Sequence, residues 1–175
     1  MRLLTQLLAL VIGLIIGFQL PDLDQRLPFL VHRSIITHGL LIPLGLFWLV
    51  WADRSWRGAG IAGLALATAV HLAFDLFPVA WLGYALITLP FVGSIGAAFS
   101  MLWLALSIIV CCALVLRLAV QPEILFAIVP IGLISFIIAA RNEQVGWLMP
   151  LLVLVVAFLV ARILFAPKNK RGRLG

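Results

Sequence analysis

The chain has 175 residues, of which 65% are hydrophobic and only 10% charged, and its mean hydropathy is +1.27. Soluble domains carry roughly 25% charged residues, so this composition excludes a soluble globular protein and predicts a chain that mostly contacts lipid. The net charge of +6 comes from basic residues at the ends of apolar stretches and in the C-terminal tail. Because no basic surface is interleaved with aromatic residues, we expect no nucleic-acid partner.

Apolar stretches and the residues that interrupt them divide the chain into predicted elements. At about 20 apolar residues per span, the sequence predicts an all-α integral membrane protein, a polytopic bundle of about six transmembrane helices in a single domain over residues 1–175. The expected spans are 3–20, 34–51, 59–78 and, as three C-terminal spans within 98–165, residues 98–119, 123–140 and 145–165. Residues 79–97 are apolar but contain Gly83, Pro90 and Gly93, so we expect an interfacial or re-entrant segment there.

The distribution of Lys and Arg predicts the orientation of the bundle. In the six-span arrangement, nine of the 12 basic residues lie on the side of Met1 and three lie on the other side. Both termini, with the basic tail at residues 166–175, are therefore expected in the cytoplasm of a multi-pass cell-membrane protein. If residues 79–97 span instead, seven spans result, the count becomes four against eight, and the predicted orientation reverses.

Half of the acidic residues and every histidine fall at one end of the first three spans, within residues 1–78. These residues are Asp22, Asp24, His32, His38, His71 and Asp75. His71 and Asp75 are four residues apart, so a helix places both side chains on one face. If the second span begins at Ser34 as the N-cap, His38 lies about 6 Å inside the membrane boundary, at a depth similar to that of His71 and Asp75. In an extended loop, the side chains of Asp22 and Asp24 would point to the same side of the backbone. We therefore expect a shallow site on the side opposite Met1.

The chemistry of these residues points to a divalent metal. An Asp within a span costs about 2.5–3.5 kcal/mol and needs a compensating partner. Imidazoles with carboxylates favour zinc, with manganese or iron also suitable, and six ligands would serve one or two ions. Structural alternatives remain open: Asp22 and Asp24 could end a helix in water, each histidine could be a hydrogen-bonded core or interface residue, and Asp75 could pair with Arg33.

Two further patterns have structural interpretations. Thr37 and Thr68 are expected to bond a backbone carbonyl of their own helix. Gly60, Gly63 and Ala67 are spaced so that they share one face of the third span, and small residues there let a neighbouring helix approach closely.

Three ordered motifs resemble those of a known family. They are Pro-Asp-Leu-Asp at 21–24, His-Arg-Ser-Ile-Ile-Thr-His at 32–38 and His-Leu-Ala-Phe-Asp at 71–75. They are similar to the motifs of the YdjM-like family of LexA-regulated, inner-membrane metal-dependent hydrolases, over about residues 13–78. The resemblance implies an inner-membrane location, metal roles for the six residues named above, and motif roles for Arg33 and Thr37. The chain departs from the family at Gln25 and Gly39, where relatives often carry His and Ser.

The leading functional prediction is a membrane-embedded hydrolase that uses metal-activated water on a phosphoester or other ester of a lipid or envelope substrate. In this prediction Asp24 or His32 is a second-metal ligand or a general base, and Arg33 holds a substrate phosphate. The alternative is a non-enzymatic metal-binding or structural subunit that packs within a larger membrane-protein complex.

Overall fold

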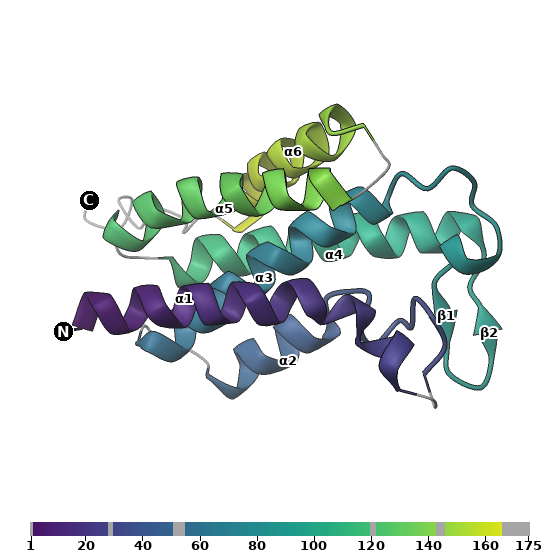
Figure 1. Cartoon of the computed structure of the whole chain (residues 1–175), viewed down its shortest axis with the longest axis horizontal. Coiled ribbons are helices and arrows are strands. Elements are labelled where there is room, and N and C mark those ends of the chain that lie inside the picture. Colours follow the sequence, from purple (N-terminus) through teal and green to yellow (C-terminus); the bar gives the residue numbers. More distant parts are fainter. Residues whose placement is uncertain (1, 28–29, 51–54, 120–121, 143–145, 166–175) are drawn as a thin grey trace, which may run out of the picture.

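The structure is a computed structural model that describes residues 2–27, 30–50, 55–119, 122–142 and 146–165 (Figure 1). Its α-helices are α1 (Arg2–Gln19), α2 (Leu41–Leu49), α3 (Trp56–Asp75), α4 (Ala97–Leu118), α5 (Pro122–Asn142) and α6 (Leu148–Phe165). Two 3-10 turns, η1 (Pro21–Arg26) and η2 (Gly83–Ala85), and two short strands, β1 (Thr88–Leu89) and β2 (Gly93–Ser94), complete the order. The predicted basic tail at 166–175 lies outside the described residues.

The length and apolar composition of the helices suit a membrane protein. Within the described part of the chain, four helices are long and apolar enough to cross a bilayer: α3, α4, α5 and α6. They correspond to the predicted spans at 59–78, 98–119, 123–140 and 145–165. The first predicted span corresponds to α1, an apolar helix of 18 residues. The prediction of a mainly helical chain with several helices long and apolar enough to span a membrane is therefore confirmed.

The prediction of a helical span over residues 34–51 is wrong. In its place the structure has α2, a helix of nine residues that is about 13–14 Å long and covers less than half of a hydrocarbon core of about 30 Å. Pro43 explains why the helix does not begin earlier: it has no N–H to donate to residue 39, and its ring would clash with that carbonyl. Ser34 is not an N-cap, because α2 begins after Leu40 and has no side-chain cap.

Helices α1 and α3 run in the same direction with their backbones in contact. A Cβ atom added to Gly13 would overlap the carbonyl of Gly60, and one added to Gly63 would overlap the carbonyl of Leu10. This confirms the closely packed face predicted for the third span. Because the two helices are parallel, their C-terminal ends lie at the same end of the molecule (Figure 1).

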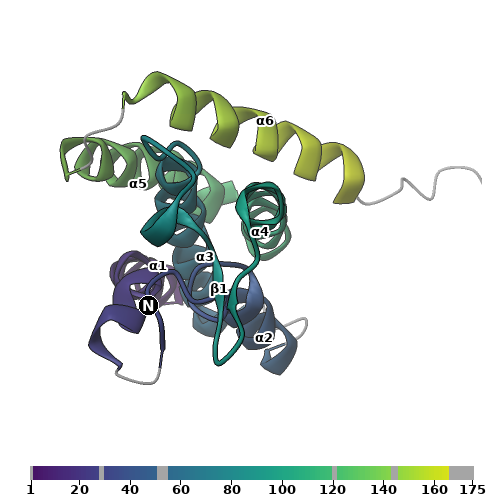
Figure 2. The same ribbon diagram turned by 90° about the vertical axis from the view of Figure 1, so that its right-hand side faces the viewer.

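Helix α3 forms the centre of the fold, and 15 of its 20 residues are buried. It packs against α1 on one side and against α4, α5 and α6 on the other. Figure 2 looks along α1 and α4 and shows that α6 crosses them at a steep angle. The described helices therefore do not form a bundle of six parallel rods.

The segment between α3 and α4 forms a wall beside the end of α3. It contains no α-helix, and its strands β1 and β2 pair in antiparallel register with Thr88 opposite Ser94. Thr88 also forms a parallel bridge with Ser34. The hydroxyl of the buried Ser100 accepts a hydrogen bond from Ile87 N at 2.9 Å and so ties the wall to α4.

The contact between α1 and α3 can be tested by adding volume. We expect Gly63→Val to lower the melting temperature in detergent by roughly 2–10 °C, since overpacking costs about 1–3 kcal/mol and the obstructing atom belongs to the Leu10 backbone. Gly45→Ala is the matched control, because nothing lies within 4 Å of a Cβ there. Equal melting temperatures for the two variants would contradict the close approach.

Candidate metal centre

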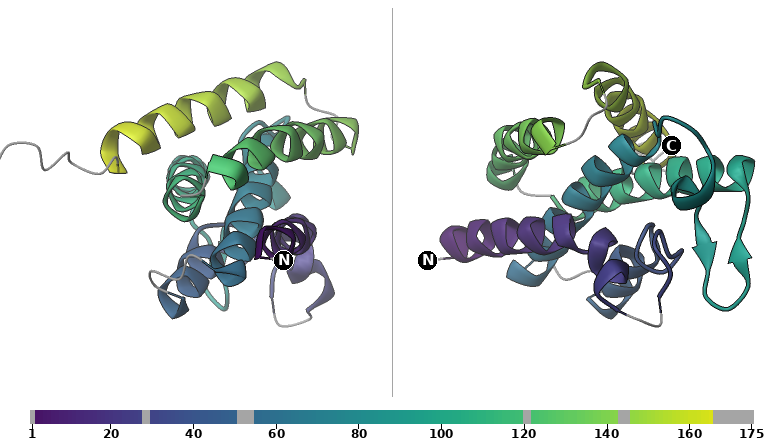
Figure 3. Two further views of the ribbon diagram at one scale, coloured as in Figure 1. Left: turned by 90° about the vertical axis from the view of Figure 1, so that its left-hand side faces the viewer. Right: turned by 45° about the vertical axis from the view of Figure 1, so that its right-hand side comes forward.

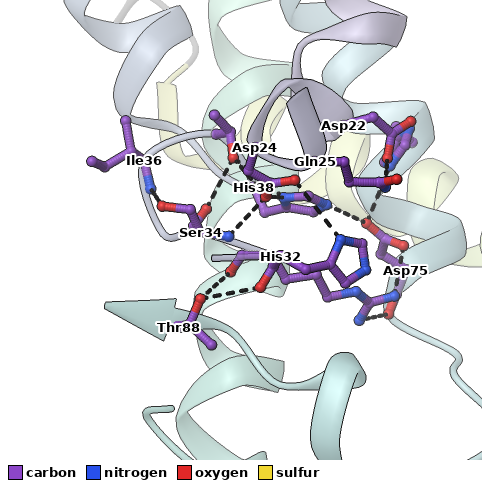
Figure 4. A network of polar contacts seen from close by, with 12 residues as sticks. Asp22, Asp24, Gln25, His32, Ser34, Ile36, His38, Asp75 and Thr88 are labelled. Atoms are coloured by element: carbon purple, nitrogen blue, oxygen red, sulfur yellow. Dashed lines mark hydrogen bonds and ion pairs between the residues drawn. The ribbon is translucent and has the colours of Figure 1, made fainter. Parts of the chain in front are cut away.

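All six residues predicted to bind metal come from segments that meet at one end of the molecule (Figure 1). Figure 4 shows five of them close together: Asp22, Asp24, His32, His38 and Asp75. Asp22 and Asp24 lie on η1, which directly follows α1, and His71 and Asp75 occupy the last turns of α3. The loop between η1 and α2 carries the remaining two, His32 and His38. The contact between α1 and α3 therefore positions the site, because it brings η1 beside the end of α3.

Three of the six residues lie close enough together that they could hold a metal ion. Asp22, His38 and His71 each offer one ligand atom, and these atoms lie within 4.8 Å of one another. Ligands that share an ion at about 2.0–2.2 Å lie up to about 4 Å apart, so a small closure would bring the three into one coordination sphere. His38 is buried, His71 is half-buried and Asp22 is exposed, so the group is open on one side.

Asp75 lies between the two histidines. Its Oδ2 atom is 3.3 Å from His71 Nε2 and 3.7 Å from His38 Nε2. The same oxygen is buried and accepts no hydrogen bond from any residue that the structure describes. A buried carboxylate oxygen in this position costs free energy unless a cation or proton compensates it. The donor set therefore fits a divalent ion, with Asp75 as a fourth candidate ligand.

Asp24 occupies a different place from the other two carboxylates. Its side chain is fully buried, and its Oδ2 lies 3.0 Å from His38 Nδ1, 2.9 Å from Ser34 N and 3.1 Å from Thr37 Oγ1. Burial by itself raises the pKa of Asp24, but the hydrogen bonds from His38, Ser34 and Thr37 and the charge of His38 hold that pKa below its usual value.

The ionised Asp24 fixes the orientation and tautomer of His38. An ionised carboxylate can only accept, so His38 Nδ1 carries a proton whether the ring is charged or neutral. In the neutral ring, the lone pair of Nε2 faces His71 and Asp75. Metal-ligating histidines are commonly held in this way by a carboxylate behind the ring. The Asp24 carboxylate lies behind the ring of His38, on the side away from the centre.

The expectation that Asp22 and Asp24 lie on one side of an extended loop is wrong. Residues Pro21–Arg26 form a 3-10 helix, which has 3.0 residues per turn, so side chains two positions apart diverge. As a result Asp22 is exposed and accepts a hydrogen bond from Gln25 Nε2 at 3.0 Å, whereas Asp24 is buried.

Arg33 makes structural contacts. Its guanidinium lies 2.8 Å from Asp75 Oδ1 and donates to the carbonyl of Ala85 at 2.7 Å. Its backbone has φ of 54°, a conformation that few non-glycine residues adopt. The pair with Asp75 is the alternative that the sequence left open, and a role in holding a substrate phosphate stays a prediction.

His32 lies at the outer edge of the site. Its side chain is 32% exposed and its Nδ1 is 3.8 Å from Asp24 Oδ1. The rings of Tyr84, His32, His38 and His71 form a row with centroids 5.9–6.0 Å apart. This row leads from the exposed Tyr84 to the buried His38. His32 is not part of the group of three, and its predicted roles remain predictions.

Sequence reasoning missed several contributors to the site. Three groups carry no signal in the sequence, because each acts through its position in the fold. They are the backbone N–H of Ser34, the carbonyl of Ala85 and the ring of Tyr84. Thr37 Oγ1 lies near both the Ser34 carbonyl, at 3.3 Å, and Asp24. Thr68, by contrast, bonds the carbonyl of Leu64 at 2.9 Å within α3 as predicted.

The electrostatics of the site favour a cation. Asp22, Asp24 and Asp75 contribute three negative charges and Arg33 one positive charge, so the group has a formal charge of −2 when the histidines are neutral. The C-terminal end of α3, and that of α1 just before η1, also face this region, and each carries a partial negative charge. A divalent ion would neutralise this group.

Comparisons of the chain with protein-family models, with curated proteins and with solved structures found no match. The likeness to the YdjM-like hydrolases therefore depends on the three motifs alone.

A stability measurement can test the structural role of Arg33. We expect Arg33→Gln to destabilise the protein by about 2–4 kcal/mol without any substrate present, because it removes the guanidinium that pairs with Oδ1 of the partly buried Asp75 carboxylate. Asp75→Asn should lower the melting temperature less in the Arg33→Gln background than in the wild-type protein. A double-mutant cycle on melting temperature therefore checks the pair. Strictly additive losses would show that the two side chains do not interact.

Proposed function

We propose that the protein is a membrane-embedded, metal-dependent hydrolase with one divalent ion held by Asp22, His38 and His71 and supported by Asp75. The observation that carries this proposal is the buried Asp75 Oδ2, which faces two imidazole Nε2 atoms and accepts no hydrogen bond from the described residues. Zinc is the first choice for two imidazoles with carboxylates, and manganese or iron also fit. The motif likeness to the YdjM-like family supports the same proposal.

The residues around the centre suggest how hydrolysis would proceed. When bound, the ion supplies Lewis acidity, which lowers the pKa of a water molecule and polarises an ester or phosphoester. Asp24 holds the proton on His38 Nδ1 and so keeps Nε2 directed at the centre. His32 is the proposed general base, because its imidazole is partly exposed and lies at the outer edge of the site, 3.8 Å from Asp24 Oδ1.

We also propose the location and substrate that the sequence predicts. Asp22 and His32 make the site accessible from one end of the molecule, and the surrounding helices are apolar, so an ester or phosphoester of a lipid or envelope molecule fits best. Because α1 and α3 run in the same direction, the chain between them would make a return crossing, with α2 as its only α-helix. With that crossing the chain would pass an inner membrane six times, both termini would be cytoplasmic and the site would face the extracytoplasmic side.

A non-enzymatic role is the second candidate. Its support is the buried network of Asp24, Thr37 and His38 together with the pair of Arg33 and Asp75, which would hold the ends of α1 and α3 together in a structural subunit of a larger complex. Metal binding without hydrolysis of any ester, together with stable partners after mild solubilisation, would favour this role.

Metal content tests the centre directly. We expect about one zinc, manganese or iron ion per chain in the detergent-purified protein, and loss of most of it in His71→Ala, as measured by mass spectrometry of the metal after dialysis. His32→Ala is the matched control, because His32 lies in the same row of rings but outside the group of three. Wild-type protein without metal, or equal retention in both variants, would refute the proposed site.

The role of Asp24 gives a separate prediction. Asp24→Asn should weaken metal affinity by about 10–100-fold while the stoichiometry at saturating metal stays at about one, as is usual for a group that orients a ligand. Asp22→Asn should instead remove a ligand and lower both the metal affinity and the stoichiometry. Competition with a chromophoric chelator measures affinity and stoichiometry together. If the two variants behave alike, Asp24 is itself a ligand.

A further inference from the structure

The wall between α3 and α4, at residues 79–94, exposes large apolar side chains at the same end of the molecule as the metal centre. Those most exposed are Val79, Leu82, Tyr84, Phe91 and Val92. We call this segment the apolar hairpin. It projects beyond the helices in the views of Figures 1 and 3. No charged residue occurs between Asp75 and Arg117, so the hairpin lacks the Lys or Glu side chains that usually protect an exposed strand edge from other chains.

The apolar hairpin is fixed to the site. Thr88 N donates to the carbonyl of Arg33 at 3.0 Å, and Ile35 N donates to the carbonyl of Thr88 at 2.9 Å. Ile87 is fully buried beneath it. The exposed side chains are therefore presented by a structured wall, and their exposure is a property of the fold.

The tip of the hairpin is a tight turn that would be more stable with a different residue. Val92 N donates to the carbonyl of Leu89 at 3.2 Å, Pro90 occupies the second position, and Phe91 occupies the third with φ of 66°. This is the pattern of a type II turn, whose third position favours glycine because of its positive φ. Phe91 is 98% exposed, so contacts within the described chain do not compensate the strained backbone.

We propose that the apolar hairpin inserts into the boundary between lipid headgroups and acyl chains of the membrane that the protein spans. The ring of Phe91 and the side chain of Val92 would lie among the acyl chains there. Trp81 and Tyr84 would lie at headgroup level, where such amphipathic rings are enriched. A segment with exposed apolar side chains and no charged residue, next to apolar helices, fits lipid, since a protein interface would normally have a polar rim.

Insertion would set the depth of the metal centre. Tyr84 contacts His32 with ring centroids 5.9 Å apart, so the mouth of the site would open at headgroup level. The substrate would then be an amphiphile whose ester lies at the headgroup while its acyl chains stay in the bilayer. This consequence depends on the proposed function, whereas the insertion does not.

Site-directed fluorescence in nanodiscs tests the insertion. A chain with Cys111→Ala and Cys112→Ala receives one cysteine, Phe91→Cys or Val92→Cys, labelled with an environment-sensitive nitrobenzoxadiazole dye. We expect a nitroxide near the headgroup end of the acyl chain to quench this dye at least about twice as strongly as aqueous iodide does, as burial to about 5–10 Å requires.

Two controls bracket this result. A dye on Arg26→Cys, on the exposed surface of η1 at the same end, should respond to iodide. A dye on Leu133→Cys, on the exposed surface of α5, should respond to a nitroxide deeper in the chain. Iodide quenching at 91 and 92 like that at 26 would overturn the proposal. Protection of the dye from iodide only in nanodiscs that hold two copies of the protein would also overturn it, because the hairpin would then bind a second chain.

A further variant separates insertion from hydrolysis and from folding. Adding His71→Ala should leave the quenching pattern at residue 91 unchanged, even if it removes all metal. Phe91→Gly should match or exceed the wild-type melting temperature in detergent, because it relieves the positive φ. A lower melting temperature would show that the Phe91 ring stabilises the protein from within and would count against insertion.

Discussion

The parallel contact between α1 and α3 is the constraint on which the rest of the structure depends. Gly13, Gly60 and Gly63 allow the two backbones to touch. Because the helices run in the same direction, their C-terminal ends are neighbours. Asp22 and Asp24, just after α1, therefore lie beside His71 and Asp75 at the end of α3. Two negative helix ends and three carboxylates in one place create a potential that favours Arg33 and a divalent cation.

The sequence was sufficient to predict which residues would meet, because polar residues are scarce and helical spacing fixes the end at which each one lies. It was not sufficient for residues 34–40, where apolar length predicted a helix. There the buried Asp24 attracts Ser34 N and Thr37 Oγ1, and Pro43 prevents the helix from extending toward the site. A long-range hydrogen bond to a side chain ten residues away leaves no periodic signal in the sequence.

The distinct roles of the six residues also depend on geometry that spacing cannot show. Asp22 and Asp24 were equivalent as an Asp-x-Asp pair, but the tight 3-10 turn directs one outward and buries the other. His32 and His38 share a loop, yet only His38 has a carboxylate within 3.0 Å behind its ring. Asp22, His38 and His71 thus form one group that could hold an ion, whereas Asp24 lies behind His38 and His32 lies at the outer edge.

The unpaired oxygen of Asp75 is the strongest reason to regard this cluster as more than structural. A buried acceptor without a donor costs about 1–3 kcal/mol, and more when it is charged. Arg33 already satisfies Oδ1, so a cluster that served only to join α1 and α3 would gain stability if a donor also faced Oδ2. Instead two imidazole nitrogens lie 3.3 and 3.7 Å from it, and one of them is held as an acceptor by Asp24. A cation shared by His38 Nε2, His71 and the Asp75 carboxylate would compensate that oxygen.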